Sequence, residues 1–273
     1  MKHLLLILLL LVAYPGVVRA FGTGELGCSG DCTSCHKVTL KEAQDIIRKI
    51  DPSMGVEKIT TSQVPGLYQV VLTKANTNGK GIAYLDFSKR YLIQGTVLDT
   101  GNKVDITGKS MRELLESQVI DVSRIKLNNA LLLGNPKGTK HLYLFSDPDC
   151  PYCAKVHDEL TKLVKKMPDL AVHILLYPLD MHPDAAWKTN AIVAASKKDM
   201  KRALAMLEAS YDKKAVKKNS SASNYANELK KMGQDLGITS TPVLVYANGS
   251  IGLGAKTQDE IKAGILKNVK TAK

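Results

Sequence analysis

The stretch that decides the fold reads FSDPDCPYC and covers residues 145–153. It begins at the end of a strand-length apolar run, residues 141–146, and its Asp-Pro-Asp sequence ends that run. Its two cysteines lie three positions apart, so a disulfide between them would close a very small ring. A helix is expected to begin at Pro151, because proline suits the first helical position, where an N–H group has no partner. The predicted order is strand, dithiol, helix.

The predicted place of Cys150 at the start of this helix favours its thiolate form, because free backbone N–H groups and the positive end of the helix dipole meet there. Cysteines in such positions have pKa values well below that of a free thiol. Cys153 lies one turn further on, near enough to attack a mixed disulfide formed on Cys150. We therefore predict a catalytic pair. A structural disulfide or half of a zinc site is the alternative, and no second CxxC follows in this region.

A second signal lies far downstream, where Thr241-Pro242 opens an apolar run. A proline that opens a strand roughly 90 residues after the CxxC sequence fits the cis-proline that faces the dithiol in thioredoxin folds. It has no N–H, and the backbone of Thr241 stays free to pair with an extended substrate. We expect Thr241 and Pro242, with Pro151 and Tyr152 between the cysteines, to bind substrate.

The segments around the dithiol predict a thioredoxin-like domain with a helical insertion over residues 129–273. After the first helix the pattern indicates a strand at 171–177, an Ala- and Lys-rich helical block at 184–236, a strand at 242–246, an Asn-Gly hairpin turn and a helix at 258–269.

The upstream region predicts a small α+β unit over residues 37–108. A helix opens with a Thr39/Glu42 capping box, and Ala43, Ile46, Ile47 and Ile50 form its apolar face. Strands are expected at 64–72, 81–86 and 91–98. A core of this size is modest, so the unit would gain from pairing with a copy of itself.

Between the two regions the sequence predicts a linker helix over residues 109–128, opened by a Ser110/Glu113 capping box. A helix packed within a single domain is the alternative.

The first twenty residues resemble a signal peptide. A short basic start is followed by an apolar run of about ten residues, and this run is too short to span a bilayer. Small residues then lead to Ala20, and we predict cleavage after it and export to the periplasm; a retained membrane anchor is the alternative. Residues 21–36 form a Cys-rich segment.

The charge is strongly basic, with 38 Lys and Arg against 26 Asp and Glu. Loss of the predicted signal peptide, which holds Lys2, Arg19 and no acid, lowers the formal net charge from +12 to +10. The lysines occur as pairs on helix-like segments without interleaved aromatic residues, so solvated helix faces explain them better than nucleic-acid binding does.

Taken together, residues 145–153, residues 237–242 and two upstream strand motifs resemble the DsbC/DsbG family of periplasmic disulfide isomerases over residues 37–272. The upstream motifs are Pro65-Gly66-Leu67-Tyr68 and Tyr84-Leu85-Asp86. The resemblance implies a V-shaped homodimer with a cystatin-like dimerisation domain, a linker helix and a catalytic domain. It also implies unfolded or misoxidised exported proteins as substrates and a DsbD-type membrane reductase as partner. Pro151-Tyr152 is more like DsbG than the Gly-Tyr common in DsbC, which leaves substrate preference open.

Three further cysteines, Cys28, Cys32 and Cys35, lie near the predicted mature N-terminus. Cys32, Cys35 and His36 form a CxxCH sequence, the attachment motif for haem c, in which the histidine would ligate the iron. A Cys28–Cys32 or Cys32–Cys35 disulfide is an alternative, and a metal site is a third, although adjacent Cys35 and His36 would strain to share one ion. The dithiol chemistry itself requires no cofactor and no metal.

These features together predict a thiol–disulfide oxidoreductase that isomerises or reduces wrong disulfides. The alternatives are a monomeric DsbA-like oxidase, a holdase chaperone and a haem-c-linked electron carrier. The other histidines, His141, His157, His173 and His182, are expected to be single, ordinary polar positions. His157, one turn beyond Cys153, is expected to be exposed to solvent; tuning of the dithiol is the alternative.

Overall fold

A computed structural model describes residues 36–75, 79–217 and 223–269 of the chain. The predicted signal peptide and the three N-terminal cysteines lie outside these residues. Within the described ranges, no helix combines the length and apolar character that crossing a membrane requires. Two folded domains follow one another along the chain, and each is described by itself.

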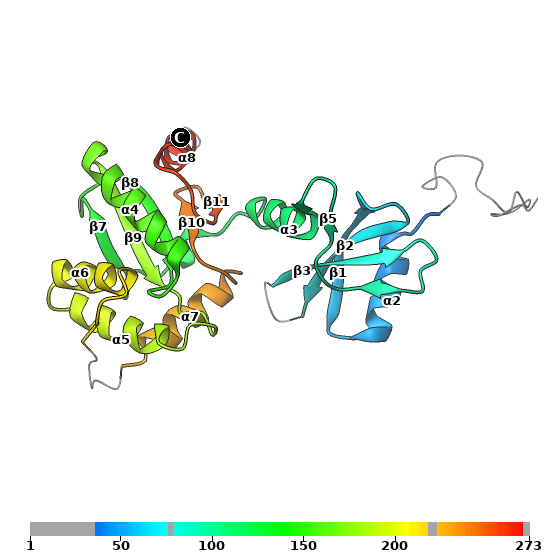
Figure 1. The fold of residues 1–273 in the computed structure, drawn as a ribbon, viewed down its shortest axis with the longest axis horizontal. Coiled ribbons are helices and arrows are strands. Elements are labelled where there is room, and N and C mark those ends of the chain that lie inside the picture. Colours follow the sequence, from blue (N-terminus) through cyan, green and yellow to red (C-terminus); the bar gives the residue numbers. More distant parts are fainter. Residues whose placement is uncertain (1–35, 76–78, 218–222, 270–273) are drawn as a thin grey trace, which may run out of the picture. The chain divides into compact units, whose positions relative to one another are not determined.

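The N-terminal domain packs one helix against a four-stranded antiparallel sheet (Figure 1). The helix is α2 (Leu40–Ile50), and the strands lie in the order β1-β2-β3-β4. Their bounds are β1 Met54–Thr61, β2 Leu67–Lys74, β3 Lys80–Asp86 and β4 Leu92–Ile93. Ala43 and Ile47 of the helix are buried against apolar side chains of the strands.

The predicted first helix is confirmed, including the capping box in which the Thr39 hydroxyl accepts from the Glu42 N–H and the Glu42 carboxylate accepts from the Thr39 N–H. One residue of the predicted apolar face was wrong: Ile50 is 62% exposed. It is the last residue of α2, which ends at the C-cap residue Asp51.

The predicted strand at 91–98 is wrong. Only the two residues of β4 pair with β3, and β5 (Leu98–Asp99) pairs instead with β6 (Val104–Asp105). Gly95, at φ 151°, lies between them and interrupts the extended run. Strand β1 was not predicted, because charged Glu57 and Lys58 and a bulge after Val56 obscure its alternation.

The predicted linker helix has different bounds. The helix α3 covers Ile106–Glu116, since the Asp105 side chain caps it by accepting from the Gly108 N–H. A short 3₁₀ turn, η1 (Val122–Arg124), is the only helical structure that follows before residue 129 in this fully described stretch. Ile120 and Ile125 gave the sequence its helical period, but they are buried as part of the C-terminal core.

The C-terminal domain contains a five-stranded sheet in the order β11-β10-β8-β9-β7 (Figure 1). Strands β8 and β9 are parallel, and the other neighbours are antiparallel. The strands are β7 Leu131–Gly134, β8 Lys140–Ser146, β9 Leu170–Leu176, β10 Val243–Tyr246 and β11 Ile251–Leu253. The helices are α4 Pro151–Lys166, α5 Ala185–Ser196, α6 Met200–Tyr211, α7 Tyr225–Asp235 and α8 Gln258–Val269.

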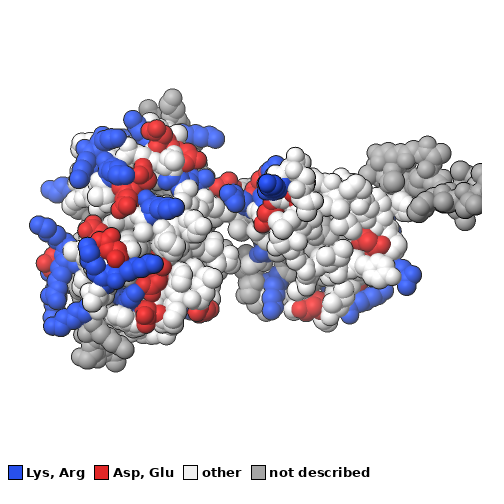
Figure 2. Space-filling view, viewed as in Figure 1, with Lys and Arg blue, Asp and Glu red and all other residues white. Residues whose placement is uncertain are grey.

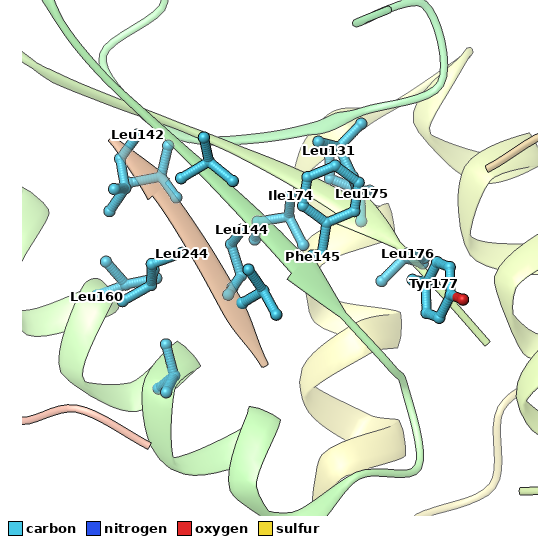
Figure 3. Close-up of a cluster of buried hydrophobic side chains, with 14 of the residues drawn as sticks. Leu131, Leu142, Leu144, Phe145, Leu160, Ile174, Leu175, Leu176, Tyr177 and Leu244 are labelled. Atoms are coloured by element: carbon cyan, nitrogen blue, oxygen red, sulfur yellow. The ribbon is translucent and has the colours of Figure 1, made fainter. Parts of the chain in front are cut away.

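The core of this domain holds β8 in place. Figure 3 shows Leu142, Leu144 and Leu244 on the side of Leu160 from α4, with Phe145 among a second group of apolar side chains. These side chains have no exposed surface. Side chains on both faces of β8 are therefore packed in the core, and this strand leads into the turn that carries the dithiol.

Candidate active site

The two cysteines of the CxxC sequence lie where β8 passes into α4. Cys150 is the N-cap residue of α4, and Pro151 is its first residue, as the sequence predicted. Both thiols are free and buried: Cys150 keeps 5% of its surface exposed and Cys153 none. A substrate can thus reach only the first sulfur.

The surroundings give the two sulfurs opposite acidities. The Cys153 thiol and the backbone N–H groups of Cys153 and Tyr152 donate to the Cys150 sulfur, and they lower its pKa to about 6 against the opposing effect of burial. Burial raises the pKa of Cys153 far above its ordinary value. At neutral pH the site therefore combines a thiolate nucleophile with a protonated thiol behind it.

The peptide bond between Thr241 and Pro242 is cis, as expected, and it faces the dithiol. The Thr241 carbonyl oxygen lies 3.9 Å from the Cys150 sulfur. Tyr152 is 59% exposed, and the Lys155 ammonium lies 5.6 Å from the centre of its ring. The structure thus brings together residues that are about ninety positions apart in the sequence and leaves the aromatic ring at the surface.

A buried carboxylate organises the loop before Cys150. Asp147 has no exposed surface, and its two oxygens accept from the N–H groups of Asp149 and Leu179, both at 2.7 Å. The His182 Nδ1 atom lies 3.0 Å from the same carboxylate. The Asp147 N–H also points at the Cys153 sulfur, 3.4 Å away. Asp147 therefore ties the active-site turn to the segment after β9.

The helical insertion holds the same loop from the other side. The Ser210 hydroxyl of α6 donates to the Pro148 carbonyl at 2.8 Å, and Lys188 of α5 forms an ion pair with Asp149. Sequence reasoning missed Asp147, Lys188 and Ser210 as site residues. The Asp-Pro-Asp sequence could have indicated Asp147, because an aspartate carboxylate commonly accepts a hydrogen bond from the backbone N–H two residues further on.

The expectations for the histidines need correction. His157 is 1% exposed rather than solvent-exposed, its Nε2 atom lies 3.4 Å from Glu208, and its ring is 5.4 Å from that of Tyr211. Burial lowers its pKa, so it is neutral at neutral pH. His141 and His173 are not single: their ring nitrogens are 3.1 Å apart across β8 and β9.

Of the proposed haem-attachment residues, only His36 belongs to the described part of the chain. The haem, disulfide and metal alternatives for Cys28, Cys32 and Cys35 therefore stay predictions. Among the described residues, no group of three or more His, Cys, Asp or Glu side chains is arranged to hold a metal ion.

Comparison with known protein families agrees with this architecture. The family model described as a thioredoxin-like domain matches residues 127–269, which is more than half of the chain. The model described as the N-terminal domain of disulfide bond isomerase proteins matches residues 37–108. The chain belongs to the thioredoxin-like family. The expected resemblance to DsbC-type proteins is confirmed, as is the fold class of a thioredoxin-like domain behind a smaller N-terminal domain.

Curated relatives carry the name of thiol:disulfide interchange protein DsbC. The Salmonella typhimurium protein is 27% identical over 223 residues, which cover 80% of this chain and 84% of the relative. The Escherichia coli K12 protein is 26% identical, with 77% and 81% covered. A probable DsbC of Bordetella pertussis is 24% identical, and the match spans 72% of this chain but only 64% of that protein.

Two solved structures are similar to parts of this chain. A disulfide interchange protein from Neisseria gonorrhoeae is 29% identical, with 53% of this chain and 98% of that chain covered and a TM-score of 0.45. Proteus mirabilis ScsC in a compact conformation is 20% identical, with 60% and 88% covered and a TM-score of 0.49.

Proposed function

We propose that this protein is a periplasmic thiol–disulfide oxidoreductase that isomerises or reduces wrong disulfides in exported proteins. The observation that carries the proposal is the paired acidity of the dithiol: Cys150 has a pKa of about 6, and Cys153 is kept protonated behind it. The names of the DsbC relatives support the same activity.

The reaction begins when the Cys150 thiolate attacks one sulfur of a substrate disulfide. A new sulfur–sulfur bond forms to Cys150, and the other substrate sulfur leaves as a thiolate that takes a proton from water. In isomerisation, the thiolate of a different substrate cysteine attacks the substrate sulfur of the mixed disulfide; a new disulfide forms within the substrate, and Cys150 leaves as a thiolate. In reduction, Cys153 loses its proton and attacks Cys150, so the substrate leaves with two thiols and the enzyme dithiol is oxidised.

The groups around the sulfurs position the substrate. The Thr241 backbone lies within 4 Å of the Cys150 sulfur and can pair with an extended chain in the manner of an added strand. Pro242 keeps its cis bond beside the dithiol, and Pro151 and the exposed Tyr152 ring offer apolar contact. These four residues are the proposed substrate-binding surface.

Isomerisation needs a reduced dithiol, so a reducing partner must return electrons after each reductive cycle. A DsbD-type membrane reductase is the proposed partner in the periplasm, with residues 1–20 as the cleaved signal peptide. The proposed assembly is a homodimer formed through the N-terminal domain. Exposed apolar side chains of its β4–β6 region support this: Tyr91, Ile93, Leu98 and Val104.

The proposal is tested with reduced protein in two assays, the reduction of insulin and the recovery of activity from scrambled ribonuclease. We expect Cys150→Ser to abolish both activities, while Cys28→Ser, a matched cysteine outside the catalytic domain, retains them. Undiminished activity in Cys150→Ser would refute the proposal. Faster action by the oxidised protein on reduced ribonuclease than by the reduced protein on scrambled ribonuclease would favour a DsbA-like oxidase instead.

A further inference from the structure

A cavity of about 370 Å³ opens directly beside the nucleophile. Its wall includes Asp149, Cys150 and Pro151 from the active-site turn, Lys188 from α5, and Lys213 and Lys214 from the turn that follows α6. All of these belong to the C-terminal domain. Because Cys150 itself lines the cavity, a group next to the substrate sulfur that Cys150 attacks lies near it.

The cavity has an excess of positive charge. Lys188 is neutralised by its ion pair with Asp149, and Lys214 lies 2.7 Å from Asp212. Lys213 is exposed, and no acidic side chain of residues 36–75, 79–217 or 223–269 pairs with it. One lysine charge is thus left over at the edge of the cavity. Figure 2 shows many Lys and Arg side chains on one face of the C-terminal domain, with Asp and Glu side chains between them.

This charge has a consequence for substrate choice. The Cys150 thiolate repels an acidic group that approaches it, unless a cation compensates that charge. A lysine without an acidic partner at the edge of the cavity offsets this repulsion when the approaching group is a carboxylate. The same lysine repels an approaching lysine. Charges at the edge of a site act mainly on the rate of association, and salt screens them.

We propose that this cavity is a subsite for the carboxylate of an Asp or Glu next to the disulfide of a substrate polypeptide, with Lys213 as the residue that recognises it. The inference rests on the proposed function and specifies its substrate class. The covalent step is unchanged: Cys150 forms the mixed disulfide, and the substrate thiolate leaves.

The test uses the full-length Cys153→Ser protein, which stops at the mixed disulfide. Three symmetrical disulfide peptides differ only in whether Glu, Gln or Lys flanks the cysteine. The rate constant of each with the protein is divided by its rate constant with dithiothreitol, which removes intrinsic differences in reactivity. We expect the Glu peptide to exceed the Lys peptide by roughly five- to tenfold at low salt, and the ratio to fall as salt is added.

The matched variants are Lys213→Glu and Lys201→Glu, the second at the opposite end of α6 and outside the cavity wall. Lys213→Glu is expected to bring the Glu-to-Lys ratio below one, and Lys201→Glu to leave it unchanged. The inference would be overturned by a Glu-to-Lys ratio near one in the protein that keeps Lys213, or by an unchanged ratio in Lys213→Glu. The proposed function would stand in either case.

Two further outcomes separate the hypotheses. If none of the peptides forms a mixed disulfide, the proposed function itself fails. Glutathione disulfide, which also carries carboxylates, is measured alongside: a Lys213 effect confined to glutathione disulfide would overturn the assignment to polypeptides.

Discussion

At position 150, two influences on one sulfur oppose each other: burial favours the neutral thiol, and the surrounding hydrogen-bond donors favour the thiolate. The donors win, and the pKa falls to about 6. Because the pKa of Cys150 in the folded protein lies below its ordinary value of 9.0, ionisation of this thiol stabilises the fold. This contribution is complete above pH 9 and is lost progressively as the pH falls from 9 to about 6.

The rate at which iodoacetamide alkylates Cys150 in the reduced protein should therefore follow a midpoint near pH 6. Cys153 should stay unreactive up to high pH, because burial raises its pKa. The measurement is mass spectrometry of quenched samples over a pH series, with Cys150→Ser as control. A midpoint near 9 would contradict the geometry described for the Cys150 sulfur.

Residue by residue, local sequence predicted where the dithiol and the cis bond lie, but it did not predict the contacts that support them. Cys150, Cys153 and the cis bond at Pro242 followed from spacing and from the proline at a strand start. Ser210 and Lys188 did not, because their contacts with Pro148 and Asp149 join segments far apart in the chain. His157 was placed on the wrong side of α4, since one polar residue on a helix does not reveal which face is buried.

Among the elements, α4 carries the first cysteine, and its packing fixes where that cysteine lies. Leu160 has no exposed surface and packs within the main core. Leu160→Ala should lower the free energy of unfolding of the C-terminal domain by about 2–5 kcal/mol, because it removes apolar contacts and leaves a cavity.

The measurement is denaturant unfolding followed by the fluorescence of Trp187, the one tryptophan of the chain, which lies on α5 of this domain. Leu266→Ala is the control, because that side chain is exposed, and it should change the free energy by less than about 0.5 kcal/mol. Equal losses in the two variants would show that the packing of α4 does not set the stability.

Elements with strong local signals were predicted to within a few residues, notably α2, α4, α8 and β8–β10. Three strands escaped prediction, and β6 is one of them because it has only two residues. The four residues of β7 are too few for periodicity to distinguish a strand from a helix, and β1 carries charges and a bulge. The linker helix was predicted to be too long, because Ile120 and Ile125 continue the helical spacing of apolar residues. In the structure both side chains belong to the core of the C-terminal domain.

For the whole molecule, the proposed homodimer makes a separate prediction. The apolar side chains of the β4–β6 region should lie at the dimer contact, and Leu98 is 62% exposed in the single chain. Leu98→Glu combined with Ile93→Glu should shift the sedimentation coefficient from that of a dimer to that of a monomer, because the contact would have to bury charge. Leu266→Glu, another exposed leucine, should leave the dimer intact. A monomeric parent protein would contradict the assembly and favour the DsbA-like alternative.

The central claim is that Cys150 is the sulfur that attacks substrate disulfides. Its most direct test is to mix the reduced Cys153→Ser protein with scrambled ribonuclease, quench with acid and map the covalent adduct by mass spectrometry. We predict a disulfide between Cys150 and a ribonuclease cysteine. An adduct on Cys28, Cys32 or Cys35 with Cys150 still free, or no adduct at all, would contradict the claim.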